Sequence, residues 1–109
     1  MNLDFEKYTE MAASALGGAS NLAVKHGQQE IDNWHLLLAL VEQEHGIVWG
    51  ILEEMAISPA AIQLATRREV EKKPSVQGRI ETNQMFSTET LREAIEETEK
   101  IAEKLGDEF

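Results

Sequence analysis

The sequence predicts an all-α helical bundle built from tandem repeats, and three observations lead to that fold class. Apolar residues recur at the helical spacing i, i+3, i+4, i+7 through most of the 109-residue chain. Capping residues precede most of these segments, and a glycine or proline follows most of them. The first and last helical segments also share one residue pattern, which is typical of repeat proteins.

The first helix is expected to begin after Thr9, whose hydroxyl can cap it, and to end at Gly27. Gly17 and Gly18 interrupt this helix, and each costs about 1 kcal/mol relative to alanine. We therefore expect a neighbouring element to pack closely against the helix at these two glycines.

The second helix is expected to be the central one, since its run LLLALV at 36–41 is apolar on nearly every side. Asp32 can cap its start. Gly46 separates it from a short third helix. The apolar residues of that third helix form a single-faced stripe: Ile47, Val48, Ile51, Leu52 and Met55.

The fourth helix has a strong start signal, because Ser58 can cap it and Pro59 suits the first helical position. It should be mostly exposed and end before Pro74. The segment 74–86 lacks helical periodicity, which predicts a connecting loop. Thr88 can then cap a last helix, whose apolar side contains Leu91, Ala94, Ile95, Ile101, Ala102 and Leu105.

The first and last helices match at a constant offset of 79 positions, from Thr9 to Thr88 (88 − 9) and from Gly27 to Gly106 (106 − 27). Apolar residues between cap and stop correspond at the same offset: Ala15 with Ala94, Leu16 with Ile95, Leu22 with Ile101, and Ala23 with Ala102. An internal repeat of a helical unit explains this match. The alternative is that two unrelated amphipathic helices share a threonine cap and a glycine stop.

The formal net charge of −10 opposes the phosphate backbone, so nucleic acid is not expected as a partner. The basic residues Arg67, Arg68, Lys72 and Lys73 are interrupted by glutamates, which favours a solvated helix face over an anion groove. The absence of cysteine excludes disulfides and thiolate ligands. No stretch has the apolar length of a membrane helix, and the first residues do not resemble a signal peptide. We expect a soluble, cytoplasmic protein without a membrane partner.

Several motifs, in order along the chain, resemble the N-terminal domain of the Clp ATPase chaperones. In that family a Gly-x-x-x-Ile segment and a cap precede a His-Leu-Leu-x-Ala-Leu helix, and here Gly27, Ile31 and Asp32 precede HLLLAL at 35–40. The segment KKPSVQG at 72–78 favours the disaggregase members over those that partner a protease. The resemblance covers essentially the whole chain. Asn33 and Trp34 depart from it, since the family usually has proline or threonine and then glutamate there.

The resemblance implies a fold of tandem four-helix repeats. Residues 1–73 would form a complete first repeat, 74–87 an inter-repeat loop, and 88–109 only the first helix of a second repeat, all in one compact domain. An apolar face that lacks its partner helices is prone to pairing. We therefore expect this chain to self-associate or to fray at its end.

The resemblance also implies a non-catalytic domain that recruits unfolded or aggregated proteins to a hexameric ATPase ring. ATP and magnesium are expected cofactors of the full-length protein, not of this chain, which has no Gly-x-x-x-x-Gly-Lys-Ser/Thr segment. The alternative function is a freestanding helical adaptor or dimerisation module.

By resemblance, Thr9 and Asp107 are candidate substrate-binding residues. Thr9 has an equally good structural explanation, because a capping hydroxyl contributes about 1 kcal/mol to a helix. The family also offers clients an apolar groove between repeats, for which the candidates are Leu91, Ile95, Ile101 and Leu105. Ordinary core packing is the favoured interpretation for most of these four residues.

A metal-dependent enzyme is a remote alternative. Glu42 and His45 form a Glu-x-x-His pair like those of di-iron bundles, but such sites need a second pair and two further glutamates. The sequence contains no second pair, so no metal is expected. His35 is expected to pack or cap at its helix start. No nucleophile, base and orienting group occur together, so no catalytic residue is assigned.

Overall fold

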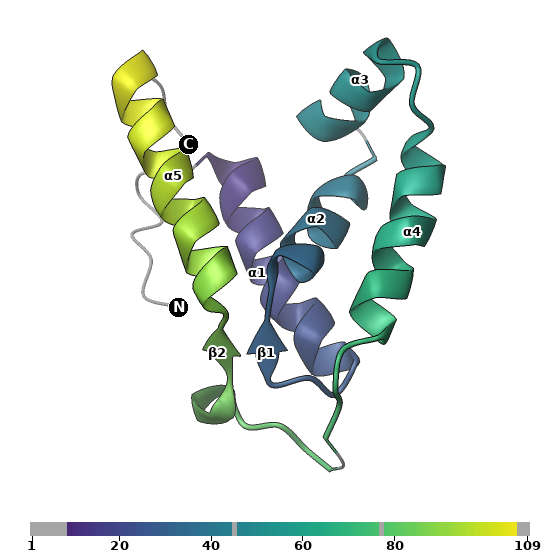
Figure 1. Ribbon diagram of the computed structural model, residues 1–109, viewed down its shortest axis with the longest axis vertical. Coiled ribbons are helices and arrows are strands. Elements are labelled where there is room, and N and C mark those ends of the chain that lie inside the picture. Colours follow the sequence, from purple (N-terminus) through teal and green to yellow (C-terminus); the bar gives the residue numbers. More distant parts are fainter. Residues whose placement is uncertain (1–8, 45, 77, 107–109) are drawn as a thin grey trace.

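The computed structural model describes residues 9–44, 46–76 and 78–106 and confirms the predicted all-α class (Figure 1). In this part of the chain the α-helices are α1 (Glu10–Lys25), α2 (Asn33–Val41), α3 (Ile47–Glu54), α4 (Pro59–Glu71) and α5 (Glu89–Leu105). A short 3-10 turn, η2 (Thr82–Gln84), and two strands, β1 (Glu30–Ile31) and β2 (Phe86–Ser87), complete the order. In Figure 1, α1 and α5 lie on one side of α2 and α4 lies on the other.

Most of the helix ends fall where the sequence places them. Thr9, Ser58 and Thr88 each accept a hydrogen bond from a backbone N–H three residues later, at 3.2, 3.2 and 3.1 Å. This side-chain bond satisfies one of the free amides that every helix start leaves. Gly27 and Gly106 follow α1 and α5 with φ of +68° and +71°, a conformation that L side chains rarely adopt.

The two glycines inside α1 differ in their surroundings. A Cβ added to Gly18 would lie 3.3 Å from the Cβ of Ala39, so α2 does approach α1 closely there. A Cβ added to Gly17 would meet nothing within 4 Å. The prediction of a close neighbour is thus correct for Gly18 and wrong for Gly17.

The strand pair was not predicted. β1 and β2 are parallel, with Glu30 opposite Phe86 and Ile31 opposite Ser87. The amides of Phe86 and Thr88 donate to the carbonyls of Gln29 and Ile31, both at 2.9 Å. Two residues are too few to produce an alternating pattern, which explains why the sequence indicated only a loop. The pair ties the start of α5 to the segment between α1 and α2.

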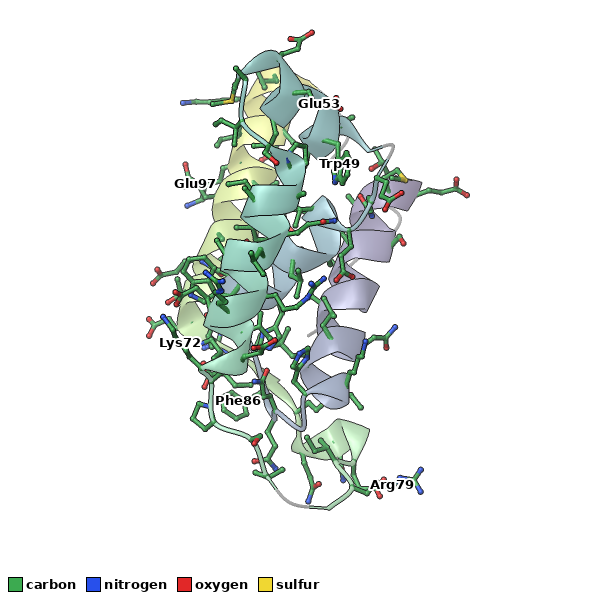
Figure 2. The ribbon with its side chains drawn as sticks, turned by 90° about the vertical axis from the view of Figure 1, so that its right-hand side faces the viewer. Trp49, Glu53, Lys72, Arg79, Phe86 and Glu97 are labelled. Atoms are coloured by element: carbon green, nitrogen blue, oxygen red, sulfur yellow. The ribbon has the colours of Figure 1, made fainter. Side chains whose placement is uncertain are left out.

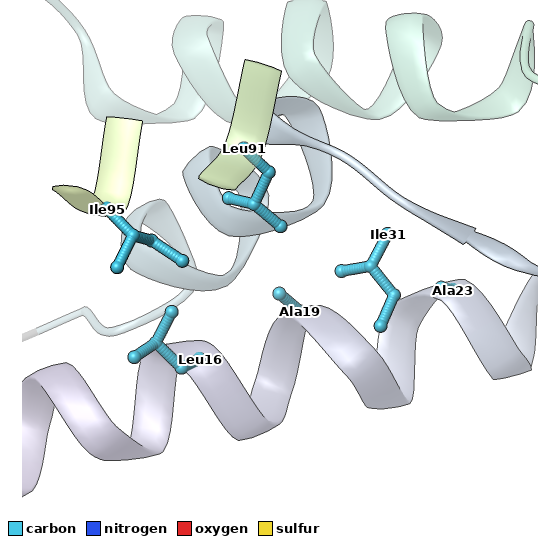
Figure 3. Close-up of a cluster of buried hydrophobic side chains, with 6 residues drawn as sticks. All are labelled: Leu16, Ala19, Ala23, Ile31, Leu91 and Ile95. Carbon is cyan, nitrogen blue, oxygen red and sulfur yellow. The ribbon is translucent and has the colours of Figure 1, made fainter. Parts of the chain in front are cut away.

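Two apolar clusters form the core. The first joins α1, β1 and α5 and contains Leu16, Ala19, Ala23, Ile31, Leu91 and Ile95 (Figure 3). The second consists of Leu38, Val41 and Val70, with partly buried side chains from α1, α3 and α4 packed around it. Because residues of α2 pack against both clusters, α2 is the central helix, as the sequence predicted. Each fully buried leucine contributes about 2 kcal/mol of hydrophobic stabilisation.

The single apolar stripe expected on α3 is divided in the structure. Val48 and Leu52 pack against the second cluster. Ile47, Ile51 and Met55 instead remain 79%, 52% and 60% exposed. The predicted stripe is therefore only partly buried, because α2 and α4, the helices that pack on α3 in the described part of the chain, cover only Val48 and Leu52.

Among the described residues, no single helix is long and apolar enough to cross a membrane. By length and composition alone, α3 and α4 reach that threshold only as a pair, and the pair is bent by 116°.

Candidate functional site

An apolar pocket of about 220 Å³ lies between α1, α2 and α5. Its walls are almost entirely hydrocarbon and are formed by Ala12, Ala15, Leu16, Leu36, Leu40, Ile95 and Thr98. Small residues on α1 leave the space that the larger side chains of the other two helices surround. A concave apolar surface of this kind suits an apolar side chain of a ligand better than a charged one.

The structure separates the four residues predicted to form an apolar groove. Leu91 is fully buried and belongs to the first cluster, so it is a core residue and not part of an accessible groove. Ile95 contributes to the same cluster and also lines the pocket. Ile101 and Leu105 are 49% and 69% exposed and extend the apolar side of α5 beyond the pocket.

Of the two polar residues predicted to bind substrate, Thr9 and Asp107, the structure describes only Thr9. Thr9 is exposed, and its hydroxyl caps α1 through the amide of Ala12, a residue that lines the pocket. A ligand in the pocket would therefore lie within one helical turn of Thr9. Asp107 lies outside the described residues.

Most of the pocket was not predicted as a site. The run that contains Leu36 and Leu40 was predicted to be central, and Ala12 and Thr98 were not named as site candidates. The available signal was the small residues on the apolar face of α1, Ala12 and Ala15, which leave space beside the larger side chains of α2 and α5.

A largely buried polar cluster joins the start of α5 to the start of α2 and the end of α4. Asp32 accepts a hydrogen bond from the Thr88 hydroxyl at 2.7 Å and forms an ion pair with Lys73 at 3.0 Å. Lys73 also pairs with Glu30 at 3.2 Å. The expectation that Lys73 belongs to a solvated helix face is therefore wrong, since its ammonium group is held by two carboxylates.

His35 and Gln28 extend this cluster into the core. The Asp32 amide donates to Nδ1 of His35 at 2.9 Å, and Nε2 of His35 lies 2.6 Å from Oε1 of Gln28. The Gln28 amide nitrogen donates in turn to the Val70 carbonyl at 2.7 Å. These partners require a neutral His35 with its proton on Nε2. The prediction of a packed or capping role for His35 is confirmed.

The electrostatics of the cluster follow from burial and pairing. Burial lowers the pKa of His35, which matches the neutral tautomer that its hydrogen bonds require. Burial raises the pKa of Asp32, but hydrogen bonds from Thr88 and Lys73 outweigh burial and hold that pKa below its usual value. For Lys73, burial is outweighed by Asp32 and Glu30, so its pKa is raised. The charged pair and the neutral histidine are thus both favoured near neutral pH.

The side chains of this cluster connect separate segments of the chain through hydrogen bonds and ion pairs, and they do not form a metal centre. Within the described ranges, no group of three or more histidine, aspartate or glutamate side chains is placed to hold a metal ion. His45, the histidine of the Glu-x-x-His pair, lies outside those ranges.

Two helices that share one residue pattern, a central helix packed against α1 and an apolar pocket lined by all three define a helical domain. The chain belongs to the family of the Clp repeat (R) N-terminal domain, whose family model matches residues 7–109. This domain is non-catalytic.

The curated relatives point to one kind of chaperone. The chain is 38% identical to the chaperone protein ClpB of Nitratidesulfovibrio vulgaris over 108 residues, covering 98% of this chain and 12% of the relative. It is 34% and 31% identical to the ClpB proteins of Bacillus cereus and Rhodopseudomonas palustris, over 108 and 107 residues with the same coverage. The chain thus spans about an eighth of the length of these relatives.

Proposed function

We propose that this chain is the N-terminal substrate-recruiting domain of a ClpB-type, ATP-dependent protein disaggregase. It would bind exposed apolar segments of misfolded or aggregated proteins at the pocket between α1, α2 and α5. The observation that carries the proposal is this apolar pocket, lined by Leu16, Leu40 and Ile95, in a chain that matches the N-terminal eighth of ClpB relatives.

The pocket's size and chemistry support weak, general binding. A volume of about 220 Å³ accommodates one or two apolar side chains, and its lining offers little polar surface that would select one sequence over another. Weak binding suits a recruiting domain, since several copies around one ring raise the effective concentration of sites. Thr9, within a turn of the pocket, and Asp107 remain candidates for contacting substrate.

The remaining parts of the function would reside outside this chain. We place ATP and magnesium binding, and assembly into a hexameric ring, in the rest of the full-length cytoplasmic protein. We also infer that residues 1–73 and 88–109 belong to successive repeats joined by 74–87. The exposed apolar residues Ile101 and Leu105 would favour weak self-association of the chain.

A binding experiment with a pocket variant tests the proposal. Thr98 is exposed on the pocket rim, so Thr98→Glu places a charge at the mouth without disturbing the core. We expect it to weaken binding of a fluorescently labelled, permanently unfolded protein about tenfold, since a charge beside an apolar site must be desolvated. Thr90→Glu is the matched control, because Thr90 is also exposed on α5 but does not line the pocket.

Equal binding by the wild type, Thr98→Glu and Thr90→Glu would refute this site. Circular dichroism melting of each variant establishes that the comparison is made between folded proteins.

A further inference from the structure

The helix α3 carries a second apolar surface that neither the core nor the pocket uses. Ile47, Ile51 and Met55 follow one another at intervals of four residues, so they form a stripe along one side of the helix. We call these three residues the α3 stripe. All of them are exposed, and none of them lines the pocket between α1, α2 and α5.

The α3 stripe cannot be buried by a simple rotation of the helix. Val48 and Leu52 pack against Leu38, Val41 and Val70, and they follow Ile47 and Ile51 by one position each, about 100° further round the helix. Trp49 adds a directional contact there, because its indole N–H donates to the Val41 carbonyl at the end of α2. The packed side of α3 is therefore fixed, and the α3 stripe lies beside it in solvent.

The surroundings of the α3 stripe are acidic. Between positions 42 and 55 the sequence contains four glutamates and neither lysine nor arginine. Glu42 pairs with Arg67 at 3.5 Å, whereas Glu44, Glu53 and Glu54 form no ion pair with any described residue. Figure 2 shows Trp49 and Glu53 at the end of the molecule opposite Arg79 and Phe86. Three uncompensated carboxylates thus accompany three exposed apolar side chains.

We propose that the α3 stripe is a docking surface for a basic amphipathic helix, that is, a segment with apolar residues at helical spacing flanked by lysine or arginine. The apolar side of such a helix would cover Ile47, Ile51 and Met55, and its basic residues would meet Glu54, beside Ile47 and Ile51 on α3, and Glu44 just before the helix. Anchors at i, i+4 and i+8 match the spacing by which one helix recognises another. This surface is independent of the substrate pocket and adds a second partner to the proposed function.

Charge argues against a second copy of the chain as the occupant. Each copy carries a net charge of −10, and pairing through α3 would bring like-charged glutamates together. Three side chains on a helix of eight residues also bury far less than the roughly 1,200 Å² of a stable dimer interface. A basic partner gains from the same charges that repel a second copy.

The test uses two synthetic 14-residue peptides that differ only in charge. One places leucines at positions i, i+4 and i+8 with lysines elsewhere on its polar side, and the other has glutamate at every lysine position. Fluorescence anisotropy of the labelled peptides measures their affinity for the 109-residue chain at low and moderate salt. We expect the basic peptide to bind and the acidic peptide to bind at least tenfold more weakly.

Variants of the chain locate the binding. The double change Ile47→Ser and Ile51→Ser should weaken binding of the basic peptide at least tenfold, and Glu44→Lys with Glu54→Lys should weaken it at least threefold. Val24→Ser is the matched control, since Val24 is a comparably exposed apolar residue, at 46%, on α1. Thr98→Glu, which tests the substrate pocket, should leave peptide binding unchanged.

Several outcomes would overturn the proposal. They are equal binding of the two peptides, no effect of the α3 stripe variants, and loss of binding in Thr98→Glu. A dimer in sedimentation equilibrium that Ile47→Ser with Ile51→Ser abolishes would assign the α3 stripe to a second copy instead. Binding of the chain to zwitterionic lipid vesicles that the same variant abolishes would assign it to a membrane surface. Because the pocket variant is measured in parallel, failure of this inference is distinguishable from failure of the proposed substrate site.

Discussion

The helices α1 and α5 begin and end alike but are buried differently. Their capping threonines have nearly the same backbone angles, φ −65° and ψ 161° at Thr9 against φ −67° and ψ 157° at Thr88. Yet α1 buries Ala15, Leu16, Ala19 and Ala23, whereas α5 buries only Leu91, Ile95 and Ala102. Local sequence therefore fixes where these helices start and stop, and the neighbouring elements decide how much of each is covered.

The two capping threonines, Thr9 and Thr88, also differ in how many hydrogen bonds they form. The Thr9 hydroxyl bonds only to its own helix among the described residues, and Thr9 is exposed. The Thr88 hydroxyl accepts from Leu91 and also donates to Asp32 across 56 positions of sequence. The same residue type in the same local geometry thus caps only its own helix at Thr9, and at Thr88 it also joins α5 to the start of α2. An exposed, singly bonded Thr9 is free to contact a ligand, and Thr88 is not.

The largest expected effect comes from the buried side of α5. Leu91→Ala should lower the free energy of unfolding by about 3 kcal/mol, because Leu91 is fully buried and its removal leaves a cavity in the first cluster. Urea denaturation measures the change. A loss below about 1 kcal/mol would mean that α5 is not packed on the first unit in solution.

The second prediction compares the two caps directly. Thr88→Ala should cost about 2 kcal/mol, since it removes both the cap and the donor to buried Asp32. Thr9→Ala should cost about 1 kcal/mol, because only a cap is lost. Equal losses in urea denaturation would remove the distinction between an inter-unit cap and a local one.

The third prediction concerns the polar cluster around Asp32 and His35, which Thr88 contacts and Thr9 does not. Because burial lowers the pKa of His35, the unfolded chain binds a proton below about pH 6.5 that the folded chain resists. Stability contributed by neutral His35 is present above that pH and is lost as the pH falls, at up to about 1.4 kcal/mol per pH unit. Denaturation midpoints between pH 7.5 and 5 should show this slope.

The variant His35→Gln tests whether this pH dependence of stability originates at His35, because glutamine does not titrate. We expect the slope between pH 6.5 and 5 to shrink in this variant even though its stability at pH 7.5 is also lower. Asp32, whose pKa is below its usual value, contributes its loss of stability at more acidic pH, below about 4. An unchanged slope in His35→Gln would assign the acid sensitivity to other groups.

The smallest expected effect falls on the uncovered side of α5. Ile101 is half-exposed, so Ile101→Ala should change the free energy of unfolding by less than about 0.5 kcal/mol. Its counterpart Leu22 packs against the second cluster, and Leu22→Ala should cost about 1 kcal/mol or more. Comparable losses at the two positions would show that α5 is covered in solution, for example by another copy of the chain.

The features that local chemistry controls could be predicted from the sequence. The caps at Thr9, Ser58 and Thr88, the stops at Gly27 and Gly106, and the central position of α2 were all predicted, because capping and periodicity depend on residues within a few positions of one another. The candidate site was predicted less fully. Only Ile95 of the four groove candidates lines the pocket, since a pocket depends on the packing of three separate helices.

By itself, the sequence determined the helices, their ends and the residue pattern that α1 and α5 share, because backbone hydrogen bonds and apolar periodicity are set over one or two turns. Only the tertiary structure decided that Asp32 meets Thr88 and Lys73, that a pocket opens beside Ala12 and Leu40, and that three of the five apolar residues named for α3 remain in solvent. The physical reason is that burial depends on which surfaces meet, and distant segments meet only when the whole chain has folded.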